Sequence, residues 1–200
     1  SLKENTRTEF LKIINTASGT ILDLVNDLLN LSIIESGELT LNLKLGSINE
    51  LIKERIYLYT HLASEKNIVI KTNYQEIPEF LFDAPRIGQV LDNLITNAIK
   101  FSPIGGVIQI STQLSPEYLH VYVIDEGPGI KNEELEKLFK PFKKLSSIPT
   151  GGEQGTGLGL AIGKKMIELH GGVLKLNLLK NHGASFSFEL PINNPVLNRQ

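Results

Sequence analysis

The sequence has no cysteine, no long apolar run and no excess of one charge. Without cysteine, disulfides, thiolate metal sites and thiol nucleophiles are excluded, which fits a reducing compartment. No apolar run approaches the ~20 residues that span a bilayer, and no signal peptide opens the chain. Lys and Arg number 20 against 22 Asp and Glu, a formal net charge of −2. This balance argues against nucleic acid as the main partner.

What is present suits a folded protein. The chain has 200 residues, of which 41% are apolar and 21% charged. This length and composition predict one globular domain with a sizeable core and a helical appendage, and they argue against wholesale disorder.

The first segment, residues 6–36, has the pattern of a long helix that Gly37 would end. Its apolar positions recur in alternating steps of four and three, which favours a helical bundle or coiled coil over a plain amphipathic helix. These positions are Phe10, Ile14, Ala17, Ile21, Leu24, Leu28 and Leu31.

Downstream, helical and strand patterns mix, with Ser47 and Glu50 forming a capping box and Asp83 and Pro85 opening a further helix. The order predicts an α+β fold, with helices on one face of a mostly antiparallel sheet. Strands are expected at residues 39–45, 68–72, 80–82, 107–113, 119–124, 173–179 and 184–190, and helices at 48–66, 133–138 and 157–169. The helix opened by Asp83 and Pro85 has an apolar pattern that runs over residues 87–101.

Asn93 and Asn97 lie four residues apart on an otherwise apolar helix and therefore share one face. Two solvated polar positions are the simpler interpretation, but paired carboxamide oxygens also suit a hard cation. Lys100 adds a positive charge near the same face.

Asp125 ends an expected strand and is followed by Gly127 and Gly129. A tight turn would explain the glycines. Alternatively, the carboxylate accepts a hydrogen bond from an exocyclic amine while the glycines let the backbone approach a flat ring. The pattern alone does not decide between the two.

Gly155, Gly157 and Gly159 come directly before a helix, where backbone N–H groups can hold phosphates. A dinucleotide-binding fingerprint would need a preceding strand, but residues 146–154 have a flexible composition. A P-loop would need Gly-Lys-Ser or Gly-Lys-Thr, and neither follows.

Residues 93–97, 125–129, 139–142 (Phe-Lys-Pro-Phe) and 155–160 resemble, in order and spacing, the N, G1, F and G2 boxes of the gyrase, chaperone-ATPase, histidine-kinase and MutL superfamily. The Phe-x-x-Phe box points to the sensor histidine kinases. Residues 83–94, 157–162, 170–172 and 183–188 also resemble these kinases. Residues 26–37 are similar to the end of the second helix of their dimerisation and phosphotransfer hairpin.

The resemblance implies a Bergerat-type ATP-binding fold, a two-layer α/β sandwich, preceded by a long coiled-coil-type helix. Residues 1–37 would be the second helix of the hairpin, 38–192 the ATP-binding catalytic domain and 193–200 a loose tail. The implied cofactors are ATP and Mg²⁺.

The resemblance also implies roles for single residues. Asn97 would ligate Mg²⁺, and Asp125 would bind the adenine amino group. Residues 143–154 would form a lid over ATP. Where many relatives have an Arg that reaches the γ-phosphate, this chain has Lys143 and Lys144, which keep the charge but lose the bidentate fork. The implied catalytic residues are Asn93, Lys100 and Lys144, and the implied nucleotide-binding residues are Asn93, Asn97, Lys100, Asp125, Gly127, Gly129, Phe142, Gly155, Thr156, Gly157, Leu158 and Gly159.

None of the four histidines, His61, His120, His170 and His182, has the context of a phosphoacceptor. We therefore expect the acceptor helix upstream of residue 1, and this chain alone should not phosphorylate itself. The implied function is to position Mg-ATP for phosphoryl transfer to that histidine and onward to a response regulator aspartate. An alternative is a degenerate nucleotide-binding or partner-binding module without kinase activity. A third, an ATPase of the chaperone or gyrase kind, is disfavoured because Asn93 stands where those enzymes have a carboxylate.

The expected partners are ATP or ADP, a second copy through the N-terminal helix in the full protein, and a response regulator, with no nucleic acid. The expected location is a cytoplasmic domain, with membrane anchoring of the full-length protein left open.

Overall fold

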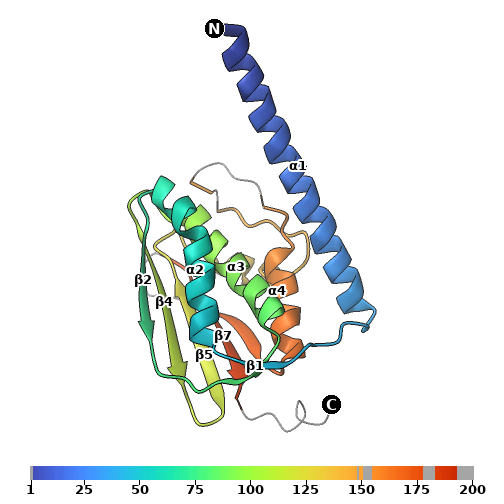
Figure 1. Cartoon of the computed structure of the whole chain (residues 1–200), viewed down its shortest axis with the longest axis vertical. Coiled ribbons are helices and arrows are strands. Elements are labelled where there is room, and N and C mark those ends of the chain that lie inside the picture. Colours follow the sequence, from blue (N-terminus) through green and yellow to red (C-terminus); the bar gives the residue numbers. More distant parts are fainter. Residues whose placement is uncertain (1, 148, 151–154, 178–182, 193–200) are drawn as a thin grey trace. The chain divides into compact units, whose positions relative to one another are not determined.

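The computed structural model describes residues 2–147, 149–150, 155–177 and 183–192. The chain divides into two compact units, Ser1–Leu39 and Thr40–Gln200. In the second unit, helices pack on one face of a five-stranded sheet (Figure 1). The prediction of an α+β fold with two layers is therefore confirmed.

The first unit is the helix α1, Leu2–Glu35. It ends where the sequence predicts, and Gly37 follows with a φ of 73°, which only glycine adopts without strain. Apolar side chains of the predicted seam, including Phe10, Ile14 and Ile21, are exposed. One expectation needs correction: by length and composition alone, the stretch Ala17–Glu35 is apolar enough to cross a membrane. The same test is passed by core helices and signal sequences, so this is weak support for a span.

The second unit begins with a small two-stranded sheet of β1 (Lys44–Gly46) and β3 (Phe80–Phe82), which pair antiparallel. The predicted strand at residues 39–45 is wrong for its first part. Because β3 has only three residues, it can pair with only three, and the Asn42 N–H instead donates to the Asp83 carboxylate at 2.8 Å.

Helix α2 (Ile48–Glu65) begins as predicted, with the Ser47 hydroxyl accepting from the Glu50 N–H. Helix α3 (Ala84–Phe101) begins after Asp83, whose carboxylate accepts from the Arg86 N–H. Its apolar positions recur with helical period and are buried against α2, a later helix (α4, Gly159–Leu169) and the sheet. This packing fixes the polar face of α3, which carries Asn93 and Asn97.

The main sheet has the order β2-β4-β5-β7-β6. Its β2–β4 pair is parallel and the other pairs are antiparallel, as the sequence predicts in the main. In the sheet, β7 pairs with β5 and places Phe186 opposite Val123. Ala184, directly before β7, accepts from the Asp125 N–H at the end of β5. The strands are β2 (Val69–Tyr74), β4 (Val107–Leu114), β5 (Tyr118–Ile124), β6 (Val173–Asn177) and β7 (Ser185–Pro191).

Between β5 and β6 lie a 3₁₀ helix, η1 (Asn132–Lys137), and the helix α4 (Gly159–Leu169). The predicted helix at residues 133–138 is thus a short 3₁₀ turn, because the Glu134 and Leu138 N–H groups donate three residues back. Helix α4 begins two residues later than predicted, because Gly157 has a φ of 74°. Residues 178–179 of the predicted strand 173–179 lie outside the described residues.

The core lies between the helices and the sheet. Its largest fully buried side chains come from α2, α3, β3, β4, β5 and β7: Ile48, Ile52, Phe82, Ile87, Leu91, Leu94, Ile95, Ile99, Ile108, Ile110, Leu119 and Phe188.

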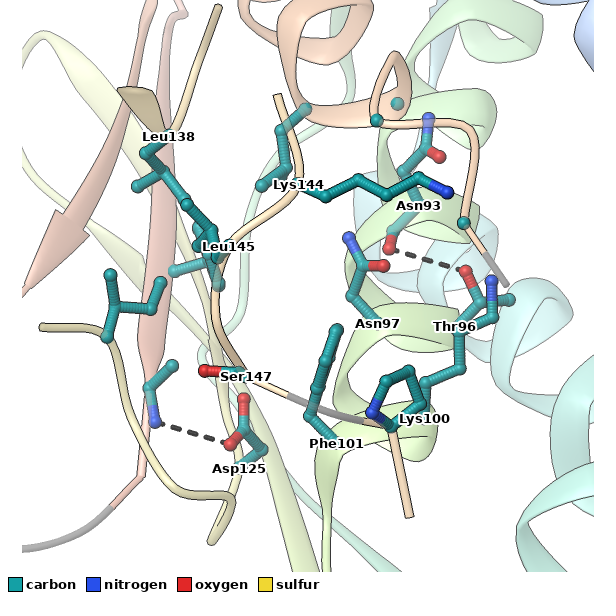
Figure 2. A pocket seen from close by; sticks show the side chains of 18 of the residues that line it. Asn93, Thr96, Asn97, Lys100, Phe101, Asp125, Leu138, Lys144, Leu145 and Ser147 are labelled. Atoms are coloured by element: carbon teal, nitrogen blue, oxygen red, sulfur yellow. Dashed lines mark hydrogen bonds between the residues drawn. The ribbon is translucent and has the colours of Figure 1, made fainter. Parts of the chain in front are cut away.

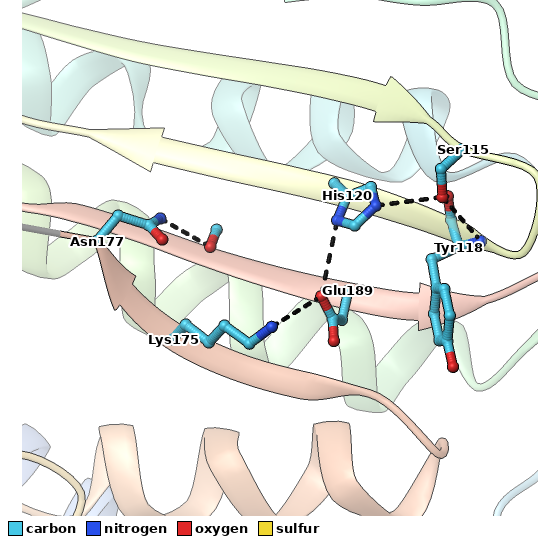
Figure 3. A network of polar contacts seen from close by, with 7 residues as sticks. Ser115, Tyr118, His120, Lys175, Asn177 and Glu189 are labelled. Atoms are coloured by element: carbon cyan, nitrogen blue, oxygen red, sulfur yellow. Dashed lines mark hydrogen bonds and ion pairs between the residues drawn. The ribbon is translucent and has the colours of Figure 1, made fainter.

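The opposite face of the sheet carries polar and aromatic side chains (Figure 3). The rings of Tyr118, His120 and Tyr122 follow one another along β5, with centroids 6.5 and 6.4 Å apart. The Glu189 carboxylate lies 3.0 Å from Lys175 Nζ and 3.8 Å from His120 Nδ1. Alternation along the strands therefore separates the core face from a polar face.

Candidate functional site

A cleft of about 510 Å³ lies in the second unit, between α3 and the chain that joins β5 to α4 (Figure 2). Polar groups stand at separate places along an otherwise apolar wall. Its lining residues are Asn93, Thr96, Asn97, Lys100, Phe101, Asp125, Pro128, Gly129, Ile130, Leu138, Lys143, Lys144, Leu145, Ser147, Pro149, Gly155, Thr156, Gly157, Gly159, Leu160, Ala184 and Phe186.

The polar face of α3 forms one side of the cleft. Asn93, Asn97 and Lys100 are half-buried and line the cleft one above the other. Thr96 also lines it, although its hydroxyl donates to the Asp92 carbonyl at 2.7 Å. Two carboxamides and one ammonium are therefore held by a helix whose other face is buried.

Asp125 forms the other polar point. It is 6% exposed, and its Oδ1 accepts from the Gly127 N–H at 2.8 Å and from the Ala184 N–H at 3.2 Å. Figure 2 shows its second oxygen turned into the cleft. Burial raises the pKa of the Asp125 carboxyl, and the two N–H groups partly offset this. One oxygen is thus held by the backbone, and the other can accept a donor from a ligand.

Gly127 holds Asp125 and does not line the cleft. A Cβ on Gly127 would lie 2.8 Å from Asp125 Oδ1 and 2.9 Å from the Phe101 carbonyl oxygen. Gly129 does line the cleft, with a φ of 73°, and a Cβ there would meet the Gly183 carbonyl oxygen at 3.0 Å. Only glycine fits at either position, because a Cβ would come too close to these atoms.

The start of α4 forms the glycine-rich side of the cleft. Gly155, Thr156, Gly157 and Gly159 line it. Among the described residues, no side chain caps the first turn of α4. Its first N–H groups, which have no partner within the helix, are therefore suited to an anion.

Two predicted residues support this turn without lining the cleft. Leu158 is fully buried, and its N–H donates to the Thr156 hydroxyl at 3.2 Å. The Phe142 side chain is 57% exposed, but its backbone N–H donates to the Gly157 carbonyl at 3.0 Å. Both residues help to hold the glycine turn in place.

Lys143 and Lys144 line the cleft from the chain that leads toward α4. Figure 2 shows the Lys144 side chain reaching across to the α3 side, where Lys100 also stands. Positive charge therefore gathers near Asn93 and Asn97, whereas the carboxylate of Asp125 lies at the other end. The charges are arranged for a ligand with an amine at one end and anionic groups at the other.

The loop side is tied down by polar contacts. Glu134 accepts from the Ser146 N–H at 2.6 Å and from its hydroxyl at 3.2 Å, and the backbone donor lowers the pKa of Glu134. The Ser147 hydroxyl donates to the Gly129 carbonyl at 3.2 Å, and the Thr150 N–H donates to the Lys100 carbonyl at 3.0 Å. These bonds hold the described part of the predicted lid beside the cleft.

Sequence reasoning missed the apolar wall. Phe101, Ile130, Leu138 and Leu145 line the cleft with Leu160 and Phe186. Ile130 directly follows the Asp-Glu-Gly-Pro-Gly motif, so its position could have suggested it. Phe186 comes from β7, far along the chain, and the resemblance of residues 183–188 to the kinases does not say that Phe186 faces the cleft.

The chain matches, over residues 82–194, the family described as histidine kinase-, DNA gyrase B- and HSP90-like ATPase. It belongs to this family. Within it, the chain is similar to the sensor histidine kinase WalK of Bacillus subtilis, with 35% identity over 189 residues that cover 91% of this chain and 30% of WalK. It thus contains the ATP-binding catalytic domain of a sensor histidine kinase, and it spans less than a third of the curated relatives it matches.

Solved structures agree with the family assignment. The catalytic domain of histidine kinase ThkA has a TM-score of 0.68 and 33% identity, covering 77% of this chain and all of that one. ThkA has also been solved in complex with the response regulator protein TrrA. Full-length ShkA in complex with AMPPNP has a TM-score of 0.80 and 26% identity, covering 94% of this chain and 39% of that one.

Proposed function

We propose that the cleft binds Mg-ATP through the residues named above. In the full protein, it would position the γ-phosphoryl group for transfer to a histidine outside these 200 residues and then to a response regulator aspartate. The observation that carries the proposal is the Asp125 carboxylate, buried and held through one oxygen by two backbone N–H groups. Its other oxygen faces the cleft, opposite Asn93, Asn97 and Lys100. ShkA, which binds AMPPNP, supports the choice of nucleotide.

Asp125 would accept a hydrogen bond from the adenine amino group. The apolar wall of Ile130, Leu138 and Phe186 gives a flat ring a dry surface, and Gly129 lets the backbone approach it. Gly127 acts on the base indirectly, by donating to Asp125.

Asn97 would ligate Mg²⁺, with Asn93 contacting phosphate or metal-bound water. The donor set fits a hard cation, because both side chains present carboxamide oxygens and both line the cleft. When bound, the cation would neutralise charge between phosphate oxygens.

Lys100, Lys144 and the backbone at Gly155, Thr156, Gly157 and Gly159 would hold the phosphates. The N–H groups at the start of α4 form the positive end of the helix dipole, which favours a bound anion. The protein's share of catalysis would then be alignment and charge stabilisation. Lys144 would place a positive charge near the γ-phosphate but would not make the two parallel hydrogen bonds that an arginine can make.

The phosphoacceptor would come from another segment. His170 is buried at the end of α4, and its ring nitrogens face the Met166 carbonyl and the Asp83 N–H. His61 is exposed on α2, and His120 lies on the polar face of the sheet. His182 lies outside the described residues. The chain alone should bind nucleotide without phosphorylating itself.

The exposed seam of α1 supports dimerisation of the full protein, since an apolar helix face needs a partner. ThkA, solved with a response regulator, supports a response regulator as the second partner. The location we propose is a cytoplasmic domain, with the apolar stretch Ala17–Glu35 leaving an anchor open.

Calorimetry with Mg-ADP tests the nucleotide site. Asp125→Asn should weaken binding about 10- to 100-fold, because the amide would present N–H donors to the adenine amino group. Inosine diphosphate, which lacks that amino group, should bind the wild type weakly, and Asp125→Asn should lose the preference for ADP.

Asn97→Ala tests the cation. It should weaken ADP binding about tenfold in Mg²⁺ and leave it unchanged in excess chelator, because only a metal ligand is removed. Asn73→Ala, an exposed asparagine on β2, is the matched control and should bind as the wild type. Absence of ADP binding by the folded wild-type chain would refute the proposal and favour a module without kinase activity.

A further inference from the structure

We propose that His170 is a positioning residue for the nucleotide site, although it does not line the cleft. Through the Asp83 backbone, it would set the register of α4 against α3 and so place Gly159 beside Asn93. This inference rests on the proposed function, because it assumes that the cleft binds nucleotide. It adds a residue that touches neither nucleotide nor metal.

His170 joins α3 and α4 at one end of the helix pair. Its ring is 2% exposed, and its Nε2 accepts from the Asp83 N–H at 3.1 Å. Nδ1 lies 2.7 Å from the Met166 carbonyl oxygen, so Nδ1 carries the proton in the neutral ring. The end of α4 is thereby bonded to the residue that precedes α3.

The other end of the pair is the nucleotide site itself. Gly159 opens α4, and a Cβ there would overlap the Asn93 carboxamide. The contact has no spare room, so a small slide of α4 along α3 would change both the Asn93 side chain and the glycine turn.

A third contact shows that these two ends share one register. A Cβ on Gly163, in the middle of α4, would lie 3.8 Å from both Val90 Cγ1 and Leu174 Cδ2. Asp83 faces His170, Val90 faces Gly163, and Asn93 faces Gly159. Along α3, the residue numbers of these contacts rise by seven and then by three. Along α4, the residue numbers of their partners fall by seven and then by four. The helices therefore run antiparallel in step, and about 16 Å of rigid helix joins the His170 bond to Gly159.

The Asp83 N–H donates to His170, and the carboxylate of Asp83 itself is used by other donors. The Asp83 carboxylate is already engaged, since Oδ1 accepts from the Arg86 N–H at 3.1 Å and Oδ2 from the Asn42 N–H at 2.8 Å. Turning this carboxylate toward its own backbone N–H would disturb the cap of α3 and the bond to Asn42. Loss of the imidazole acceptor would leave the Asp83 N–H buried without a partner, and shifting α4 is one way to relieve that cost.

The test compares His170→Gln with His170→Leu. Glutamine can place an acceptor near the position of Nε2, whereas leucine fills the space without one. His170→Leu should weaken Mg-ADP binding about tenfold, because a shifted α4 would displace Asn93 and the glycine turn, and His170→Gln should bind close to the wild type. In ¹⁵N spectra, the Asn93 side-chain amide signals should shift in His170→Leu and return in His170→Gln.

Ile68→Ala is the control for a loss of stability alone. Ile68 is buried and lies between α2 and β2, outside both helices. Denaturant unfolding would be measured for all variants. Equal loss of affinity in Ile68→Ala and His170→Leu at equal stability would show a merely structural role and overturn the proposal.

Two further outcomes separate this inference from the proposed function. A wild-type chain that does not bind ADP refutes the nucleotide site, while the Asn93 signals still test the register. A wild type that binds, with His170→Leu binding equally and unchanged Asn93 signals, overturns only the role of His170.

Discussion

The two sides of the cleft are built differently. On one side, α3 holds Asn93, Asn97 and Lys100 because its opposite face is buried in the core. On the other, Leu138 is the one buried residue among the described residues 129–147 and 149–150. This segment is held by polar bonds such as Ser146 to Glu134 and Ser147 to the Gly129 carbonyl. The first side depends on apolar burial, which is non-directional and large. The second depends on single hydrogen bonds near solvent, each of which contributes little net stability.

This difference predicts that the two sides of the cleft differ in rigidity. The α3 side should hold its groups in one geometry whether or not a ligand is bound. The loop side should be adjustable, because few apolar contacts oppose its movement. Stability and affinity should therefore respond to different substitutions.

The largest expected effect is on the α3 side. Leu94→Ala should lower the free energy of unfolding by about 2–5 kcal/mol, because Leu94 is 1% exposed and its truncation leaves a cavity. Denaturant unfolding measures this loss. Leu145→Ala on the loop side should cost less than about 1 kcal/mol, since Leu145 is half-buried, yet it should weaken ADP binding by removing apolar wall. A large stability loss in Leu145→Ala would contradict this difference between the two sides.

The contact between α3 and the start of α4 should give the next effect. Gly159→Ala should cost about 1–3 kcal/mol and weaken ADP binding, because the new methyl group overlaps the Asn93 carboxamide. Gly155→Ala is the matched control for stability, since a Cβ there meets nothing within 4 Å. Equal free energies of unfolding for the two alanine variants would show that the Gly159–Asn93 contact is unimportant.

The smallest expected effect concerns Asp125. Burial raises its folded pKa above the ordinary value of 3.8. The unfolded carboxyl then ionises first, so the stability of the wild type relative to Asp125→Asn should fall as pH rises from about 4 through the folded pKa. The effect is small because the two N–H partners offset the burial. Unfolding of both proteins across this pH range measures it, and a difference that grows in favour of the wild type would refute the argument.

Local signals predicted most elements. The Ser47–Glu50 cap, the Asp83 cap and the period of α3 act within a few residues, so the start of α2 and both ends of α3 were predictable. The strand at residues 39–45 was not, because its extent depends on the three residues of β3. Ten of the thirteen residues that the sequence proposed for the site line the cleft, while Gly127, Phe142 and Leu158 support it from behind.

The α+β class, the helix caps and the order of the boxes could be predicted from the chain alone, since these depend on neighbouring residues and on period. Which groups meet across the fold could not. Ala184 donates to Asp125 across 59 positions, Phe186 joins the cleft wall, and His170 accepts from Asp83 across 87. The reason is physical. Such contacts follow from how buried faces pack, and packing depends on the whole set of elements and not on any one stretch of chain.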